Sequence, residues 1–126
     1  MVNQQTIGER ARGTALSAAD LAALRDSLNE QRLFRREQIQ QLTATAVPRT
    51  EAPLDRRAAA QTEVRVQLAA SARMVLADVE AALERMDQGR YGRCHLCHGP
   101  IDRGLLTIVP QARSCARCRH LREAGR

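Results

Sequence analysis

The first helical pattern in the chain is a stripe of apolar residues spaced three and four apart, interrupted once. The stripe comprises Leu21, Leu24, Leu28, Ile39 and Leu42, and this spacing is typical of one face of a helix. Gln31 and Arg35 interrupt its middle. Before it, Ser17 offers a hydroxyl that can cap backbone N–H groups, and Asp20 lies near the positive end of the helix. We expect a helix that runs to about Thr43, roughly 40 Å long.

A second and more regular stripe follows. It comprises Val64, Leu68, Ala72, Val75, Val79, Leu83 and Met86. The spacing predicts a helix from about Asp55 to Gln88, with Gly89 as its C-terminal cap. A loop over 43–54, which contains two prolines, separates this helix from the first. Two amphipathic helices joined in this way predict an antiparallel coiled-coil hairpin over 16–88.

The rest of the chain adds little core. The 126 residues include only two aromatic side chains, so the chain is one domain at most, and its alanines suit close helix–helix contact. Residues 1–15 show no periodicity and are expected to be a disordered lead. Residues 89–126 are expected to form a small module with a short C-terminal helix around Ser114–Glu123. The predicted fold class is therefore all-α.

No apolar run approaches membrane-spanning length, and the N-terminus lacks the features of a signal peptide. We therefore expect a cytoplasmic protein without a membrane anchor, and a monomer. Its net charge of +6 comes from residues 89–126, whereas residues 1–88 are neutral as a whole. The candidate basic patch comprises Arg90, Arg93, Arg113, Arg117 and Arg119. Such a patch can attract nucleic acid or an acidic protein surface, or can simply offset the charge of a metal site.

All the cysteines of the chain fall in two C-x₂-C pairs that are seventeen residues apart. They are Cys94, Cys97, Cys115 and Cys118. This spacing is typical of a four-thiolate zinc site, because each short turn places two sulfurs on one edge of a tetrahedron. Four protein ligands leave no open position, so we expect one structural Zn²⁺ rather than a catalytic metal.

Other interpretations of the cysteines fit less well. Two disulfides, or covalent haem at Cys94–His98, would each need export, and haem would leave the second cysteine pair unexplained. A redox dithiol expects a strand–helix setting that is missing here. His95, His98 and His120 can each replace a thiol, but four cysteines already suffice. No Ser/His/Asp constellation or open metal site is visible, so we do not expect an enzyme.

Residues 82–97, with the sequence ALERMDQGRYGRCHLC, carry a family resemblance. Together with the second cysteine pair and with Ile101, Leu106, Pro110 and Ala112, they resemble the DksA/TraR zinc-finger family. The resemblance covers about half of the chain. It implies a regulator that binds RNA polymerase and not DNA, with a coiled coil that enters the secondary channel and an acidic tip that approaches the catalytic centre.

The tip departs from the family pattern. Members that regulate initiation carry Asp-x-x-Asp-x-Ala before the second helix. Counting back from Cys94 without gaps places Glu51, Leu54 and Arg56 at these positions, and a shift of one residue does not restore the motif. Two carboxylates nevertheless remain among several arginines. The residues expected to contact the polymerase are Glu51, Asp55, Arg56 and Arg57.

A second departure concerns the alarmone ppGpp. The resemblance places its basic ligands at positions that here hold Asp78, Val109 and Arg119, so only one cation remains and binding is not expected. The alternative function is a zinc-ribbon protein that binds nucleic acid or the ribosome through its arginine-rich module. Against that alternative, the module offers only Tyr91 for base stacking.

Overall fold

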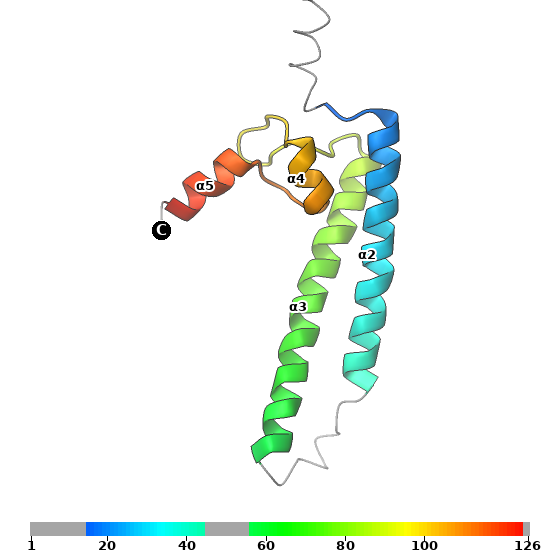
Figure 1. The fold of residues 1–126 in the computed structure, drawn as a ribbon, viewed down its shortest axis with the longest axis vertical. Helices are drawn as coiled ribbons and strands as arrows, with labels where there is room; N and C mark the ends of the chain where they lie inside the picture. The colour runs from blue at the N-terminus through cyan, green and yellow to red at the C-terminus, as the bar shows by residue number, and fades with distance from the viewer. Residues whose placement is uncertain (1–14, 45–55, 125–126) are drawn as a thin grey trace, which may run out of the picture.

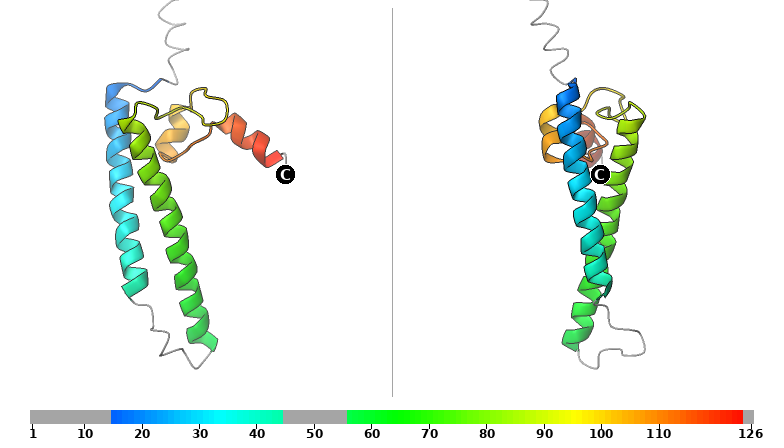
Figure 2. Two further views of the ribbon diagram at one scale, coloured as in Figure 1. Left: turned by 180° about the vertical axis from the view of Figure 1, so that it is seen from behind. Right: turned by 90° about the vertical axis from the view of Figure 1, so that its right-hand side faces the viewer.

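The computed structural model describes residues 15–44 and 56–124. This part of the chain contains the helices α2 (Ala18–Ala44), α3 (Arg56–Asp87), α4 (Arg103–Ile108) and α5 (Ala116–Ala124). Helices α2 and α3 lie side by side and antiparallel, and α4 and α5 lie beside the end of this hairpin that is opposite its tip (Figure 1, Figure 2). The predicted all-α hairpin with a four-cysteine module and a short C-terminal helix is confirmed.

Helix α2 begins at the predicted cap. The N–H of Asp20 donates to Oγ of Ser17, and the N–H of Ser17 donates to Oδ2 of Asp20, each at 3.0 Å. These reciprocal bonds form a capping box, which satisfies two backbone donors that a helix end leaves free. The N–H of Ser17 is also the main reason why the pKa of Asp20 is lowered. The local sequence therefore determines where the hairpin starts.

Helix α3 ends at the predicted glycine. Gly89 has φ +71°, a conformation that costs glycine little. Its N–H donates to the carbonyl of Met86 at 3.1 Å, and the N–H of Arg90 donates to the carbonyl of Arg85 at 2.8 Å. This pair of bonds is a Schellman motif. It turns the chain out of the helix and into the module.

The contact between α2 and α3 is well predicted near the module and wrongly predicted near the tip. The buried residues of α3 are Ala69, Ala72, Val79, Ala82 and Leu83. Val64 and Leu68, which the pattern placed in the contact, are 53% and 47% exposed. Residues three and four positions before Ala72 lie on the same side of the helix, and here the small Ala69 faces α2 in place of Leu68. The tip half of α3 therefore keeps apolar side chains on its surface.

Two buried clusters join the hairpin to the module. One contains Leu24, Cys94, Ile101 and Leu106, and the other contains Leu28, Val79, Ala82 and Leu83. Met86 and Tyr91 pack against both clusters. The module is thus fixed on the base of the hairpin rather than tethered to it.

Four further observations complete the fold. Helix α2 continues through Ala44, so the first two residues of the predicted 43–54 loop are helical. The remainder of that loop and residues 1–14 of the predicted lead lie outside the described residues. Helix α4 was not predicted. Within the described ranges, no helix combines the length and the apolar character needed to cross a membrane.

Candidate metal centre and the surrounding charged surface

The first cysteine pair lies on a tight loop between α3 and α4. The N–H of Ile101 donates to the carbonyl of Gly92 at 2.8 Å, and the N–H of Cys94 donates to the carbonyl of Gly99 at 2.8 Å. The turn itself is closed by the N–H of His98, which donates to the carbonyl of Cys94 at 2.9 Å. His98 has φ +62°, a left-handed conformation that is uncommon outside glycine. This backbone places the sulfurs of Cys94 and Cys97 within 4.8 Å of each other.

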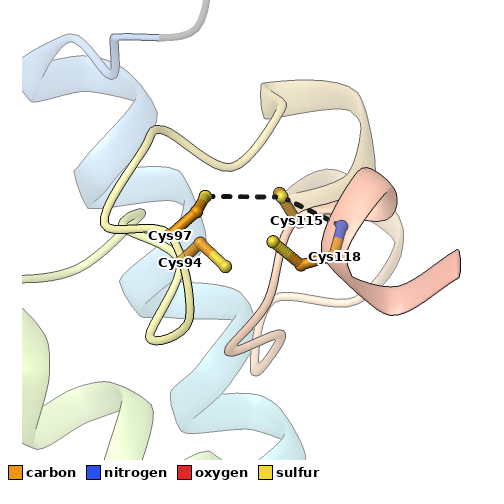
Figure 3. A group of neighbouring side chains, drawn as sticks. All are labelled: Cys94, Cys97, Cys115 and Cys118. Carbon is orange, nitrogen blue, oxygen red and sulfur yellow. Dashed lines mark hydrogen bonds between the residues drawn. The ribbon is translucent and has the colours of Figure 1, made fainter. Parts of the chain in front are cut away.

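The second pair lies where α5 begins, with Cys115 just before the helix and Cys118 in its first turn. The ligand atoms of all four cysteines lie within 4.8 Å of one another (Figure 3). Sγ of Cys97 and Sγ of Cys115 are 3.8 Å apart. Four sulfurs around a zinc ion at the usual bond length would be separated by about 3.8 Å. The four side chains therefore already lie close to tetrahedral positions.

Backbone donors surround the sulfurs. The sulfurs of Cys94, Cys97 and Cys115 each accept a hydrogen bond from a backbone N–H, with an N–S distance of 3.4 Å. Such donors favour the thiolate form of a cysteine. Burial alone would raise the pKa of the Cys94 thiol, but backbone N–H groups near its sulfur lower that pKa to about 6. The pKa of Cys118 is raised to about 12, mainly by the side chain of Cys115. Thiols this close cannot all ionise unless a cation joins them, so the donor set fits a metal ion.

The histidines near the cysteines do not belong to the metal-binding group. Nδ1 of His95 lies 2.9 Å from the carbonyl oxygen of Arg113, which also accepts the N–H of His95. This contact ties the first cysteine loop to the segment before α5. His98 and His120 are exposed. In the described part of the chain, the metal-binding group consists of cysteines alone.

One polar contact lies within the module, and a second joins the module to the hairpin. The hydroxyl of Tyr91 donates to the carbonyl of Pro110 at 2.8 Å, and a guanidinium nitrogen of Arg103 lies 3.5 Å from Oδ2 of Asp20. Burial raises the pKa of Tyr91 to about 12, although Arg85 opposes this shift. The neutral phenol is therefore part of the folded module.

Replacing Tyr91 by phenylalanine should lower the free energy of unfolding by about 1 kcal/mol, because the buried Pro110 carbonyl loses its donor. Since the pKa of Tyr91 is higher in the folded state, its contribution is complete below pH 10 and is lost as the pH rises toward 12. Urea unfolding across this range measures both effects. The pKa of Cys118 is also about 12 in the metal-free protein, so the variant should lose only the part of the alkaline destabilisation that Tyr91 causes, and the comparison is made with metal-loaded protein. An unchanged alkaline profile would contradict this assignment.

The five arginines of the predicted basic patch do not all share one hollow. Arg113 and Arg119 line an open hollow of about 320 Å³ near α4 and α5, together with Val109 and Arg122. Arg93 lines a different hollow, beside Tyr91. Side-chain nitrogens of Arg90 donate to Oε1 of Gln88, and Arg117 is exposed on α5. The hollow beside Arg119 thus gathers three cations together with Glu123, and Arg122 belongs to it although the sequence did not single that residue out.

At the tip, Arg56 and Arg57 form the exposed start of α3, whereas Glu51 and Asp55 lie outside the described residues.

The charge of α3 is distributed unevenly along the helix, although residues 1–88 are neutral as a whole. The tip half, residues 56–74, carries Arg56, Arg57, Arg65 and Arg73 against Glu63. The base half, residues 75–87, carries Asp78, Glu80, Glu84 and Asp87 against Arg85. Helix α3 is therefore basic near the tip and acidic near the module.

The hairpin and the cysteine group together define a class of protein: a long antiparallel helix pair that carries a small four-cysteine module at its base. No family model and no curated protein matches the chain. Among solved structures, the chain is similar to the transcription factor DksA2 from Pseudomonas aeruginosa, with a TM-score of 0.76 and 25% sequence identity over 89% of each chain. The chain therefore has a DksA-like fold.

Proposed function

We propose that this protein is a transcription regulator of the DksA/TraR family and that it binds RNA polymerase through the secondary channel. The observation that carries this proposal is the similarity to a transcription factor across 89% of both chains, which includes hairpin and module together. The family-like sequence of residues 82–97 supports it independently of the fold. The proposed role is non-enzymatic and cytoplasmic, and it does not require direct contact with DNA.

The metal in the proposed protein is one Zn²⁺, held by the four cysteines. Four soft thiolates in a tetrahedral arrangement favour zinc over harder cations, and they leave no position for a substrate. When bound, the ion links the loop after α3 to the start of α5. Its role is therefore to hold the module in shape.

In this proposal the hairpin is a rigid element that enters the secondary channel. Helix α3 has 32 residues, so it carries the tip roughly 48 Å from the module. Arg56 stands at the position of the family's alanine and Arg57 follows it, both exposed, and they weaken any acidic field at the tip. We therefore propose that the protein acts chiefly by occupying the channel rather than by presenting carboxylates to the catalytic centre.

A binding measurement with purified components tests the function. The full-length, metal-loaded protein should bind RNA polymerase and should bind ribosomes or free RNA much more weakly at the same salt concentration. Binding to ribosomes or RNA alone, if lost on charge reversal at Arg113, Arg117 and Arg119, would instead establish the nucleic-acid alternative.

The alarmone ppGpp is expected to add little to this protein's effect. Each charge-assisted contact to a phosphate contributes about 1.5–3 kcal/mol, and Asp78 and Val109 stand where two of the family's cations would be. Two missing contacts correspond to a loss of more than about a hundredfold in affinity. Titration of ppGpp into the polymerase complex, with any other alarmone site on the polymerase disabled, measures the loss.

The matched comparison is the same titration without this protein. Micromolar binding that appears only when the protein is present would show the expectation to be wrong. In that case Arg113, Arg119 and Arg122, which line one hollow, would be the residues that replace the missing cations, and charge reversal at Arg122 should remove the binding.

A further inference from the structure

A small hollow lies between the tip ends of α2 and α3. Its volume is about 110 Å³, and it is lined by Leu42, Thr43, Thr62, Arg65, Val66, Ala69 and Arg73. The residues from α2 belong to the last turn of that helix, which ends at Ala44. Ala69 is buried, whereas Val66 is 61% exposed. The hollow therefore extends from the contact between the helices to the surface of the hairpin.

The interior of the hollow is apolar although two threonines line it. Oγ1 of Thr43 donates to the carbonyl of Ile39 at 2.8 Å, and Oγ1 of Thr62 donates to the carbonyl of Ala58 at 3.0 Å. Each hydroxyl hydrogen is thus used within its own helix, as is common for threonine in helices. The remaining lining residues, apart from two arginines, are aliphatic. A group that enters the hollow meets mainly carbon atoms.

Arg65 and Arg73 border the hollow, and both are exposed. They are eight positions apart, which is roughly 12 Å along the helix. The surrounding surface is basic as well, because residues 56–74 carry four arginines against Glu63. An apolar hollow with cations at its edge is complementary to a group that combines an apolar part with an anion.

The size of the hollow decides which class of partner supplies that group. Pockets for cofactors and drug-sized ligands have about 300–1,000 Å³, whereas a hollow of about 110 Å³ accepts a single side chain. Nucleic acid fits less well, because none of the described residues that line the hollow is aromatic and could stack on a base. The features together favour an acidic segment of a protein.

We propose that this hollow receives an apolar side chain of RNA polymerase that has a carboxylate beside it, and that Arg73 pairs with the carboxylate. This inference rests on the proposed function, which places the tip half of the hairpin in the secondary channel. It adds the chemistry of the contact, namely an apolar and acidic segment of the channel wall. The contact is formed by the sides of α2 and α3 and is separate from the tip loop.

Affinity of the full-length, metal-loaded protein for purified RNA polymerase tests the contact. Arg73→Glu should weaken binding by at least about tenfold, because it sets two carboxylates against each other. Thr43→Phe should also weaken binding, because the ring occupies the hollow. Both positions are exposed, so helicity by circular dichroism should not change. The matched controls are Arg117→Glu on α5 and Leu33→Phe on α2, where Leu33 is 59% exposed and outside the hollow; both should bind like the unmodified protein.

Crosslinking identifies the segment that enters the hollow. A photoreactive residue in place of Val66 should crosslink to a polymerase segment in which an apolar residue lies next to an aspartate or a glutamate. Replacing that acidic residue by arginine should weaken binding of the unmodified protein and restore binding of Arg73→Glu. Such restoration requires direct pairing, so a merely structural role of Arg73 would not produce it.

The outcomes separate this inference from the proposed function. If the unmodified protein does not bind RNA polymerase, both are wrong. If it binds, and Arg73→Glu and Thr43→Phe bind equally well, the proposed function stands and this inference is overturned. Crosslinks from position 66 that map to RNA, or to a polymerase segment without a carboxylate, would overturn it as well.

Discussion

Replacing Cys115 by serine should abolish metal binding and release α5 from the module. Helix α5 has no buried residue, and its Leu121 is 64% exposed. Apolar packing therefore contributes little to its position, and the thiolates of Cys115 and Cys118 must supply most of it. Zinc binding in small modules contributes about 10–16 kcal/mol to folding. Metal analysis should fall from one zinc per chain to none, and hydrogen exchange over residues 113–124 should become fast.

The loss should be confined to the module. Leu28 remains buried against Val79, Ala82 and Leu83 of the hairpin, so most of the helicity of α2 and α3 should survive. His120→Ala is the matched control, since this exposed residue lies on α5 but outside the metal-binding group. A metal-free Cys115→Ser protein that keeps α5 protected would contradict the account.

Replacing residues 49–57 by a neutral Gly/Ser loop should abolish the effect on transcription with little change in stability. Loop tips carry few packing contacts, and Arg56 and Arg57 are exposed. Purified transcription with metal-loaded protein measures the effect, and urea unfolding shows whether the fold is kept.

The module supplies the matched comparison for the tip variant. Charge reversal at Arg113, Arg117 and Arg119 should leave most of the activity, because the proposed recognition element is the hairpin. If the tip variant kept full activity while charge reversal in the module destroyed it, the arginine-rich surface would be the recognition element and the nucleic-acid or ribosome alternative would take its place.

Features that depend on neighbouring residues could be predicted from the sequence. Ser17 and Asp20 start α2 through hydrogen bonds to each other, and Gly89 ends α3 through its own backbone conformation. The grouping of the four cysteines followed from their spacing, because a short turn fixes the distance between the sulfurs of each pair. In each case the physical cause lies within a few residues of its effect.

Features that depend on tertiary contact could not be predicted. Helix α4 has six residues, and its N-cap Asp102 makes no side-chain hydrogen bond. It is positioned by burial of Leu106 against the hairpin, which no local pattern reports. In the same way, the pattern alone could not decide whether Leu68 or Ala69 faces α2, because both lie near the same side of the helix.

The charged surface was predicted least well. The arginines of the basic patch were grouped by composition, yet long exposed side chains are positioned by the fold, and they divide between separate hollows. The uneven charge of α3 was present in the sequence, but it became visible only when the charges were counted by half-helix. Glu51 and Asp55 remain predictions, because they lie outside the described residues.

Site-specific crosslinking to purified RNA polymerase tests the central claim most directly. A photoreactive residue at Arg57, near the tip, is compared with one at Arg117, on α5; both positions are exposed. The account predicts that crosslinks from position 57 map to the walls of the secondary channel, and that a competitor filling this channel removes them. Crosslinks from position 117 should lie outside the channel. An absence of channel crosslinks from position 57 in a complex that forms with high affinity would contradict the account.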